Sequence, residues 1–232
     1  MTERFGLIFI CFSEPKIEAD EFFAELERRL DKYQLAQMKP IEARDFEFDV
    51  NWKISLENSL DFYHVTRVHP KTVGAHIDNL PLYENIDLHC LQTLHIAPYF
   101  WRTMIDKHCA RRDVYTDHEL SSLHKYYVFP NLVLNVLPYH LTIMQFFPID
   151  HERCIMRYRF CMREKPSLLE RTRSYASWVA SRIILYEDVK IYPQIQRGMN
   201  QGSIVEQPLH KEEIGVSHFH ASLESWLQDS SN

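Results

Sequence analysis

Residues 166–189 read PSLLERTRSYASWVASRIILYEDV and predict one long helix. Ser167 and Glu170 have the spacing of a capping box, in which each side chain accepts a hydrogen bond from the backbone N–H of the other residue. Apolar side chains then recur at helical spacing, at Tyr175, Trp178, Val179, Ile183 and Tyr186. We expect the helix to end near Gly198 and Gly202, so it is long enough to cover a sheet.

Several β-like segments precede this helix. They cover residues 88–97, 100–107, 125–129, 132–137, 141–147 and 154–162. The polar residues 148–152 between the last two segments are typical of a hairpin turn. Antiparallel strands followed by one helix make an α+β order. We therefore expect one curved antiparallel sheet packed on the long C-terminal helix, with a cavity between them.

The segments nearer the two ends of the chain are shorter. We expect strands at residues 5–12 and 46–54, helices at 18–33, 55–68 and 218–227, and a surface loop at 74–84. The sequence contains no internal repeat and no low-complexity linker. One domain is the simplest organisation.

Glycine is scarce, with 5 residues in 232. The glycines stand apart at positions 6, 74, 198, 202 and 215, so no glycine-rich phosphate-binding loop can be assembled from them. This excludes kinases, P-loop NTPases and Rossmann dinucleotide-binding proteins.

The charges argue against nucleic acid and membrane partners. The chain has 32 acidic residues against 26 Lys and Arg, a formal net charge of −6 and no long basic stripe. The early apolar run at residues 6–12 is too short to span a membrane. The five cysteines form no C-x-x-C pair and are expected to be reduced thiols. We expect a cytoplasmic protein.

The stretch most informative about chemistry is ENSLDFYHVTRVH, residues 57–69. On one continuous helix, Glu57, Asp61 and His64 would lie on the same face. His69 would be rotated about 140° from His64, and the proline that follows predicts that the helix ends there. His69 can therefore join His64 only if the last turn is loosened.

Two imidazoles in one short segment suit a transition metal, and a carboxylate would complete the site. Asp188 is a candidate, because it lies on an otherwise apolar face of the long helix, where an unpaired charge is costly. Two histidines and one carboxylate form the facial triad of non-haem ferrous iron. On spacing alone a zinc site for hydrolysis fits nearly as well, and ordinary surface or core residues are the commoner explanation of such patterns.

Residues 51–70 resemble the mononuclear-iron motif of the Rieske-type non-haem iron oxygenases, the large subunits of ring-hydroxylating dioxygenases and related monooxygenases. The residues that carry this resemblance are Asn51-Trp52-Lys53, Glu57-Asn58, Asp61, Tyr63-His64 and His69. Further similar segments are Phe129-Pro130-Asn131-Leu132, Glu187-Asp188, Gln196-Arg197-Gly198-Met199 and Phe219-His220. The resemblance therefore extends over nearly the whole chain.

The resemblance implies roles for individual residues. His64, His69 and Asp188 would be the ligands of a mononuclear Fe(II). Asp61 would be the bridging acid that links the iron site to a Rieske cluster on a neighbouring subunit. The implied fold is the helix-grip domain. With dioxygen as co-substrate, the implied reaction is hydroxylation, dihydroxylation or oxidative demethylation of a small organic molecule.

The substrate is less well specified. Residues near the motif positions are candidates for the substrate pocket, namely Asn58, Phe62, Val65, Asn131 and Tyr186. The motif resembles both the benzoate-type aromatic dioxygenases and the quaternary-ammonium monooxygenases. We expect an aromatic acid, because the pattern from His64 to His69 is closest to that branch. A cation-binding aromatic cage stays open.

The cysteines depart from the family pattern. A Rieske domain holds its [2Fe-2S] cluster with two cysteines and two histidines, and this sequence has no C-x-H or C-x-x-H. We expect residues 1–15 to be the remnant of the end of such a domain, and residues 16–232 to form the catalytic domain. The implied partners are a Rieske ferredoxin or Rieske-domain chain, an NAD(P)H reductase, and further copies of the chain in a trimer.

Two other hypotheses remain open. The chain could be a truncated or degenerate oxygenase fragment that is inactive alone, because it has no cluster motif of its own. It could also be a helix-grip protein that binds a hydrophobic ligand without chemistry.

Overall fold

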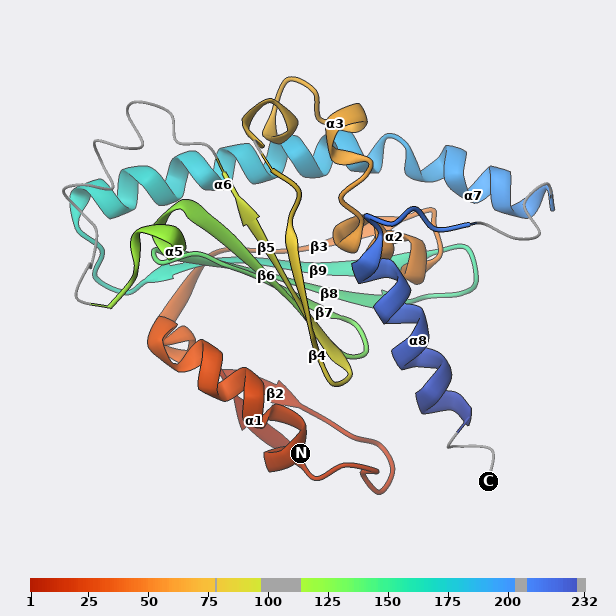
Figure 1. Ribbon diagram of the computed structural model, residues 1–232, viewed down its shortest axis with the longest axis horizontal. Coiled ribbons are helices and arrows are strands. Elements are labelled where there is room, and N and C mark those ends of the chain that lie inside the picture. Colours follow the sequence, from red (N-terminus) through yellow and green to blue (C-terminus); the bar gives the residue numbers. More distant parts are fainter. Residues whose placement is uncertain (78, 97–113, 203–207, 229–232) are drawn as a thin grey trace.

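A computed structural model of the chain describes residues 1–77, 79–96, 114–202 and 208–228. Its centre is one sheet of β3 (Met38–Phe48), β4 (Leu82–Ile86), β5 (His89–His95), β6 (Ser122–Val128), β7 (Leu132–Val136), β8 (His140–Pro148) and β9 (Cys154–Arg163). These seven strands are antiparallel and lie in the order β3-β9-β8-β7-β6-β5-β4 (Figure 1). Neighbours in the chain are neighbours in the sheet, except that β3 pairs with β9.

Helices lie on both sides of this sheet (Figure 1). On one side are α6 (Leu168–Val189), α7 (Tyr192–Asn200), α2 (Trp52–Leu60), α3 (Val65–Val68) and α8 (Ile214–Gln228). The other side carries α1 (Ala19–Leu30) and a small hairpin of β1 (Thr2–Arg4) and β2 (Leu7–Phe9). The short helix α5 (Asp117–Ser121) leads into β6.

Alternation along the strands divides the interior into two cores. In β6, Tyr126 and Val128 belong to the core beneath α1, together with Leu26 of that helix. Tyr127 belongs to the core beneath α2 and α8, and Lys125 faces a cavity on the same side. The face towards α1 is therefore mainly apolar, with His124 beside Tyr33 as a polar exception, and the opposite face carries polar groups beside the cavity.

Hydrogen bonds at its first turn fix the start of α6. The N–H of Glu170 donates to Ser167 Oγ at 3.2 Å, and the N–H of Ser167 donates to Glu170 Oε2 at 2.8 Å. The predicted capping box is thus confirmed. The predicted end near Gly198 is wrong, because α6 stops at Val189, where the ring of Pro193 would clash with the carbonyl of a continued helix.

The α+β class, the antiparallel sheet and the long C-terminal helix are confirmed. The expected strand at residues 46–54 is confirmed only at residues 46–48, which end β3. Beyond them the Asn51 side chain accepts a hydrogen bond from the N–H of Lys53 at 3.0 Å and starts α2. The expected strand at residues 5–12 is partly a hairpin, since Phe5 and Gly6 turn the chain with positive φ.

Two further differences concern the middle of the chain. The expected loop at residues 74–84 already contains the first residues of β4, and the expected strand at residues 100–107 lies outside the described residues.

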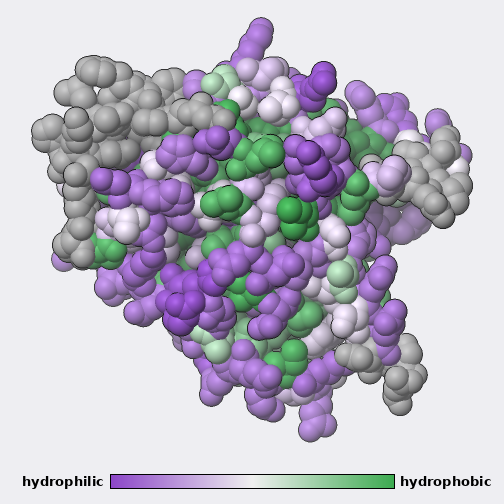
Figure 2. Space-filling view, viewed as in Figure 1, coloured by the Kyte–Doolittle hydropathy of each residue, from purple (hydrophilic) through white to green (hydrophobic). Residues whose placement is uncertain are grey.

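Cys90, Cys154 and Cys161 are buried free thiols, and Cys11 is an exposed one. No helix in the described ranges has the length and apolar character that a bilayer span requires. On the face drawn in Figure 2, apolar side chains reach the surface in separate patches between polar ones.

Candidate metal centre

The segment between α2 and α3 is not helical. Asp61 follows α2 with an extended backbone, at φ −70° and ψ 138°. Its carboxylate accepts hydrogen bonds from the backbone N–H groups of Tyr63 at 2.6 Å and His64 at 3.0 Å, which stabilises the turn that follows. The prediction of a single helix is therefore wrong, and Glu57, Asp61 and His64 do not share a helix face. Glu57 instead lies 3.0 Å from Nε2 of His220.

This break brings the two histidines together. His69 ends the single turn of α3 with φ −115° and ψ 41°, so the last turn is loosened as the pairing required. The imidazole rings of His64 and His69 have centroids 5.3 Å apart. Downstream, the N–H of Gly74 donates to the His69 carbonyl at 3.0 Å and closes the loop.

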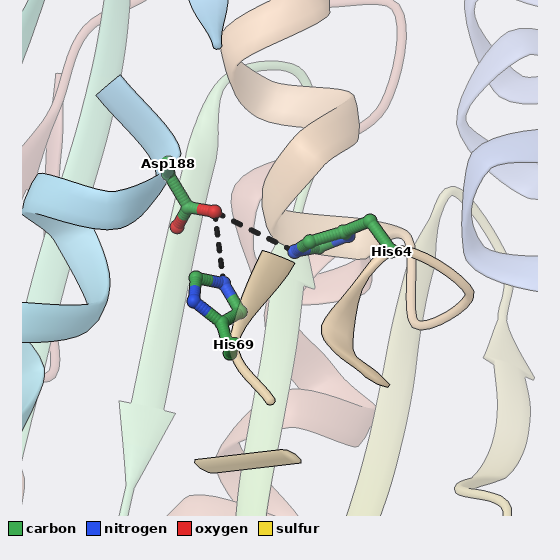
Figure 3. Close-up of side chains that lie close together, drawn as sticks. All are labelled: His64, His69 and Asp188. Carbon is green, nitrogen blue, oxygen red and sulfur yellow. Dashed lines mark ion pairs between the residues drawn. The ribbon is translucent and has the colours of Figure 1, made fainter. Parts of the chain in front are cut away.

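Asp188 reaches the two histidines from the last turn of α6 (Figure 3). Its Oδ1 lies 2.9 Å from Nε2 of His69 and 3.6 Å from Nε2 of His64. One ligand atom from each of the three residues lies within 4.8 Å of the others. His69 and Asp188 are buried, with exposed fractions of 1% and 9%. The structure thus brings together the three residues that were predicted as metal ligands.

A second carboxylate orients each imidazole. Nδ1 of His64 lies 2.8 Å from Oδ2 of Asp61, and Nδ1 of His69 lies 2.7 Å from Oε2 of Glu187. Since a carboxylate accepts, Nδ1 donates its proton in both rings and Nε2 offers its lone pair to the centre. The hydroxyl of Thr72 also donates to Glu187, at 2.7 Å.

Sequence reasoning did not find the roles of Glu187 and Thr72. The available signal was a second acid directly beside the expected ligand Asp188. Thr72 has no comparable signal, because its bond to Glu187 joins residues 115 positions apart in the chain.

The carboxylates set the electrostatics of the centre. Burial lowers the pKa of His69, but the negative charges of Asp188 and Glu187 outweigh it, and the pKa is raised overall. Burial raises the pKa of Asp61, but the hydrogen bond and charge of His64 outweigh it, and that pKa is lowered. Three carboxylates around two imidazoles make a centre that favours a cation.

Two buried atoms at the centre test whether a metal fits. His69 Nε2 and Asp188 Oδ1 face each other, yet neither has a hydrogen-bond partner among the described residues. Buried polar atoms normally have one, because leaving them without a partner is costly. Two imidazole nitrogens and one carboxylate oxygen, supported by outer carboxylates, are the donor set of a facial triad. The residues therefore fit a divalent transition metal.

A cavity of about 690 Å³ adjoins this centre, between the sheet and α6. Three residues predicted to contact substrate line it, namely Asn58, Phe62 and Val65. Asn131 and Tyr186 lie elsewhere, which corrects their assignment to the pocket. The Asn131 amide donates to the carbonyl of Phe146 at 2.9 Å, and Tyr186 is 64% exposed on the outer side of α6.

Residues 35–229 match the protein family described as "Ring hydroxylating alpha subunit (catalytic domain)". The chain belongs to this family.

Curated relatives align over short stretches. The glycine betaine monooxygenase oxygenase subunit of Chromohalobacter salexigens is 26% identical over 78 residues, which are 34% of this chain and 18% of that protein. Its counterpart in Pseudomonas aeruginosa is 32% identical over 66 residues, which are 28% of this chain and 15% of that protein. Both alignments therefore cover only a small part of the relative.

Solved structures align over most of this chain. A quaternary ammonium Rieske monooxygenase, studied for carnitine oxidation by gut microbiota, has a TM-score of 0.70 at 16% identity and covers 92% of this chain. Dicamba monooxygenase bound to dicamba has a TM-score of 0.58 at 12% identity and covers 84%. The chain spans 57% and 60% of the lengths of these two proteins. The likeness confirms that this family member has the catalytic-domain fold of the Rieske oxygenases.

Proposed function

We propose that this chain is the catalytic domain of a Rieske-type oxygenase and that His64, His69 and Asp188 hold a mononuclear Fe(II). The observation that carries the proposal is the meeting of two imidazole nitrogens and one carboxylate oxygen beside a cavity. Family membership favours iron over zinc for this donor set. When bound, ferrous iron supplies an open coordination site at which dioxygen is activated beside the substrate.

The protein's own residues prepare the site. Asp61 and Glu187 hold the two imidazoles with Nε2 towards the centre, which fixes their tautomers. We assign Asp61 the further role of bridging acid towards a Rieske cluster on a neighbouring subunit, because its carboxylate is bonded directly to His64. Asn58, Phe62 and Val65 are proposed to contact the substrate, since they line the cavity beside the histidines.

The proposed reaction is hydroxylation, dihydroxylation or oxidative demethylation of a small organic molecule, with dioxygen as co-substrate. Electrons would come from NAD(P)H through a reductase and then through a Rieske ferredoxin or a Rieske-domain chain. Association into a homotrimer is proposed from the family resemblance. Relatives named as glycine betaine and dicamba monooxygenases support a small organic substrate.

Metal analysis tests the proposal. The full chain is loaded with Fe(II) without oxygen, passed through a desalting column and assayed for iron. We expect about one iron per chain in the wild type and a large loss in His64→Ala and Asp188→Ala. His151→Ala is the control, because His151 lies in the β8–β9 turn with an 87% exposed side chain. The assignment would be refuted if the wild type retained no iron. It would also be refuted if His64→Ala and Asp188→Ala both retained as much iron as the wild type.

Turnover separates the remaining hypotheses. The iron-loaded chain is incubated with ¹⁸O₂, a Rieske ferredoxin, its reductase and NADH, and products are examined for the label. Labelled product supports the oxygenase. Iron binding without product under these conditions would favour a degenerate fragment. Ligand binding that persists unchanged in the double variant His69→Ala/Asp188→Ala, with no iron bound by the wild type, would favour a carrier.

A further inference from the structure

A row of polar side chains crosses the floor of the cavity. The row runs from Gln92 on β5 to Lys125 on β6, Asn135 on β7 and Thr142 on β8. Each is the direct cross-strand partner of the next, and all four line the cavity. Direct partners carry neighbouring side chains on one face of a sheet. An ammonium thus stands between two amides, with a hydroxyl beyond them.

The neighbouring rows of the floor are mostly apolar, with His140, two positions before Thr142 on β8, as a polar exception. Leu94 pairs with Leu123 on one side, and Met144 pairs with Tyr158 on the other, and all four line the cavity. In a mostly apolar pocket, a few polar groups fix how a ligand is oriented. The polar row is therefore positioned to select one polar group of a ligand whose remainder is apolar.

Lys125 gives this row its charge. Its ammonium donates to the carbonyl of Ser59 near the end of α2, and an ammonium has three N–H groups. Burial lowers the pKa of Lys125 to about 8, while the charges of Asp188 and Asp61 oppose the lowering. The group is therefore cationic at neutral pH and lies within electrostatic reach of the candidate metal centre.

No carboxylate in the described cavity wall is available to Lys125. The acidic residues of that wall are Asp61 and Asp188, and both are engaged with histidines. In the same row, Oδ1 of Asn135 is buried and has no hydrogen-bond partner within the described ranges. A half-turn of the amide would place its NH₂ group there instead. A second cation, Arg173, also lines the wall.

We propose that this row binds the carboxylate of the substrate, with Lys125 as counter-ion and Asn135 as a hydrogen-bond partner. That the ligand is a substrate rests on the proposed function. The apolar rows then receive the body of the molecule. A cation without an acid group would meet the like charge of Lys125 and bind poorly. An aromatic acid and a betaine both carry the required carboxylate.

A purely structural role for Lys125 makes a different prediction. A cation at the end of a helix stabilises the helix dipole, and Lys125 contacts the last turn of α2. If that were its whole role, removing the charge would lower stability without changing the affinity for a ligand.

Calorimetric titration of the full chain distinguishes these roles. The ligands are benzoate, glycine betaine, choline and benzyl alcohol, each titrated into metal-free protein and into anaerobically iron-loaded protein. We expect at least one carboxylate to bind more tightly than choline and benzyl alcohol. The tighter of benzoate and glycine betaine identifies the source of the carboxylate. Lys125→Met should weaken that binding by about 10- to 100-fold, as expected for a hydrogen bond to a charged group.

Matched variants keep the test decisive. Lys39→Met removes an exposed charge from β3, away from the cavity, and should leave the affinity unchanged. If Lys125→Met does not fold, Asn135→Leu should weaken the same binding. The proposal is overturned if neither carboxylate binds, if choline or benzyl alcohol binds as tightly, or if the affinity of a correctly folded Lys125→Met protein is unchanged.

The iron measurement remains separate from this titration. A chain that retains iron but binds no carboxylate would refute this inference and leave the proposed function standing. A chain that binds a carboxylate through Lys125 but retains no iron would refute the proposed function and leave the anion site.

Discussion

Replacing Gly74 with alanine tests how little movement the loop that carries His69 can tolerate. Gly74 lies in the 3₁₀ turn Val73–His76. A Cβ at this position would lie 2.7 Å from the carbonyl oxygen of His69 and 2.8 Å from that of Val65. Ordinary Cβ contacts begin at 3.4 Å, so both backbone carbonyls would have to retreat by about 0.6–0.7 Å.

This displacement has a cost in stability and in metal binding. Overpacking of this kind costs about 1–3 kcal/mol of the free energy of unfolding. Metal–ligand distances tolerate deviations of only about 0.2 Å, so moving the His69 backbone three times as far should disturb the donor set. We expect Fe(II) affinity to fall by about 10- to 100-fold, comparable to the loss of an outer partner of a metal ligand.

Gly198→Ala is the matched control. Gly198 lies in α7, and a Cβ there would have nothing within 4 Å. Alanine favours a helix interior by about 0.5–1 kcal/mol over glycine, so this variant should be slightly more stable. Urea unfolding gives the stabilities, and competition with a chelator gives the iron affinities. If Gly74→Ala matches Gly198→Ala in both quantities, the reasoning about the loop is wrong.

Three further predictions concern single residues. Glu187→Gln keeps a hydrogen-bond acceptor for His69 but removes the charge, and it should weaken iron binding about tenfold. Chelator competition measures the iron affinity, with the exposed Glu164→Gln as the control. Equal iron affinities in the two variants would contradict the prediction. Burial lowers the pKa of His124 from 6.5 to about 4, so between these values the unfolded chain binds a proton that the folded chain does not. The free energy of unfolding should therefore fall by about 3 kcal/mol as the pH drops through this range, and His124→Leu should lack this contribution. Urea unfolding of both proteins at pH 7 and pH 4 measures it, and an equal loss of stability in the two proteins would count against the prediction. Phe219 is fully buried, and Phe219→Ala should lower the free energy of unfolding by about 3–5 kcal/mol, measured by urea unfolding. A loss below about 1 kcal/mol would disprove its role in the core.

Local signals were sufficient for much of the fold. The strands β7, β8 and β9 are rich in apolar residues and are separated by turn residues, and the start of α6 is encoded by Ser167 and Glu170 within one turn. The break after α2 was not predictable from helical spacing. It depends on the Asp61 carboxylate capturing backbone N–H groups of the next residues, which competes with continuing the helix.

Some residues of the candidate site could likewise be predicted from local sequence, and others could not. His64 and His69 stand close together in the chain, and Asp188 stood out as an acid on an apolar face. Glu187 could be assigned to His69 only once the end of α6 was placed against the α3 loop. The polar row around Lys125 depends on the register of four strands, which single-sequence alternation does not specify.

The ligands of the candidate centre come from two elements that are far apart in the chain. His64 and His69 flank α3, whereas Asp188 lies at the end of α6. A cation shared by them would act as a cross-link that closes the chain between residues 69 and 188. Closing so long a loop restricts the unfolded chain and adds to the contacts that already join this region to the end of α6, namely those of His69 and Thr72 with Glu187 and of the two histidines with Asp188. Loading the metal should therefore slow amide hydrogen exchange in the last turns of α6 without any added ligand, so that a bound metal would also order the part of the cavity wall that α6 provides.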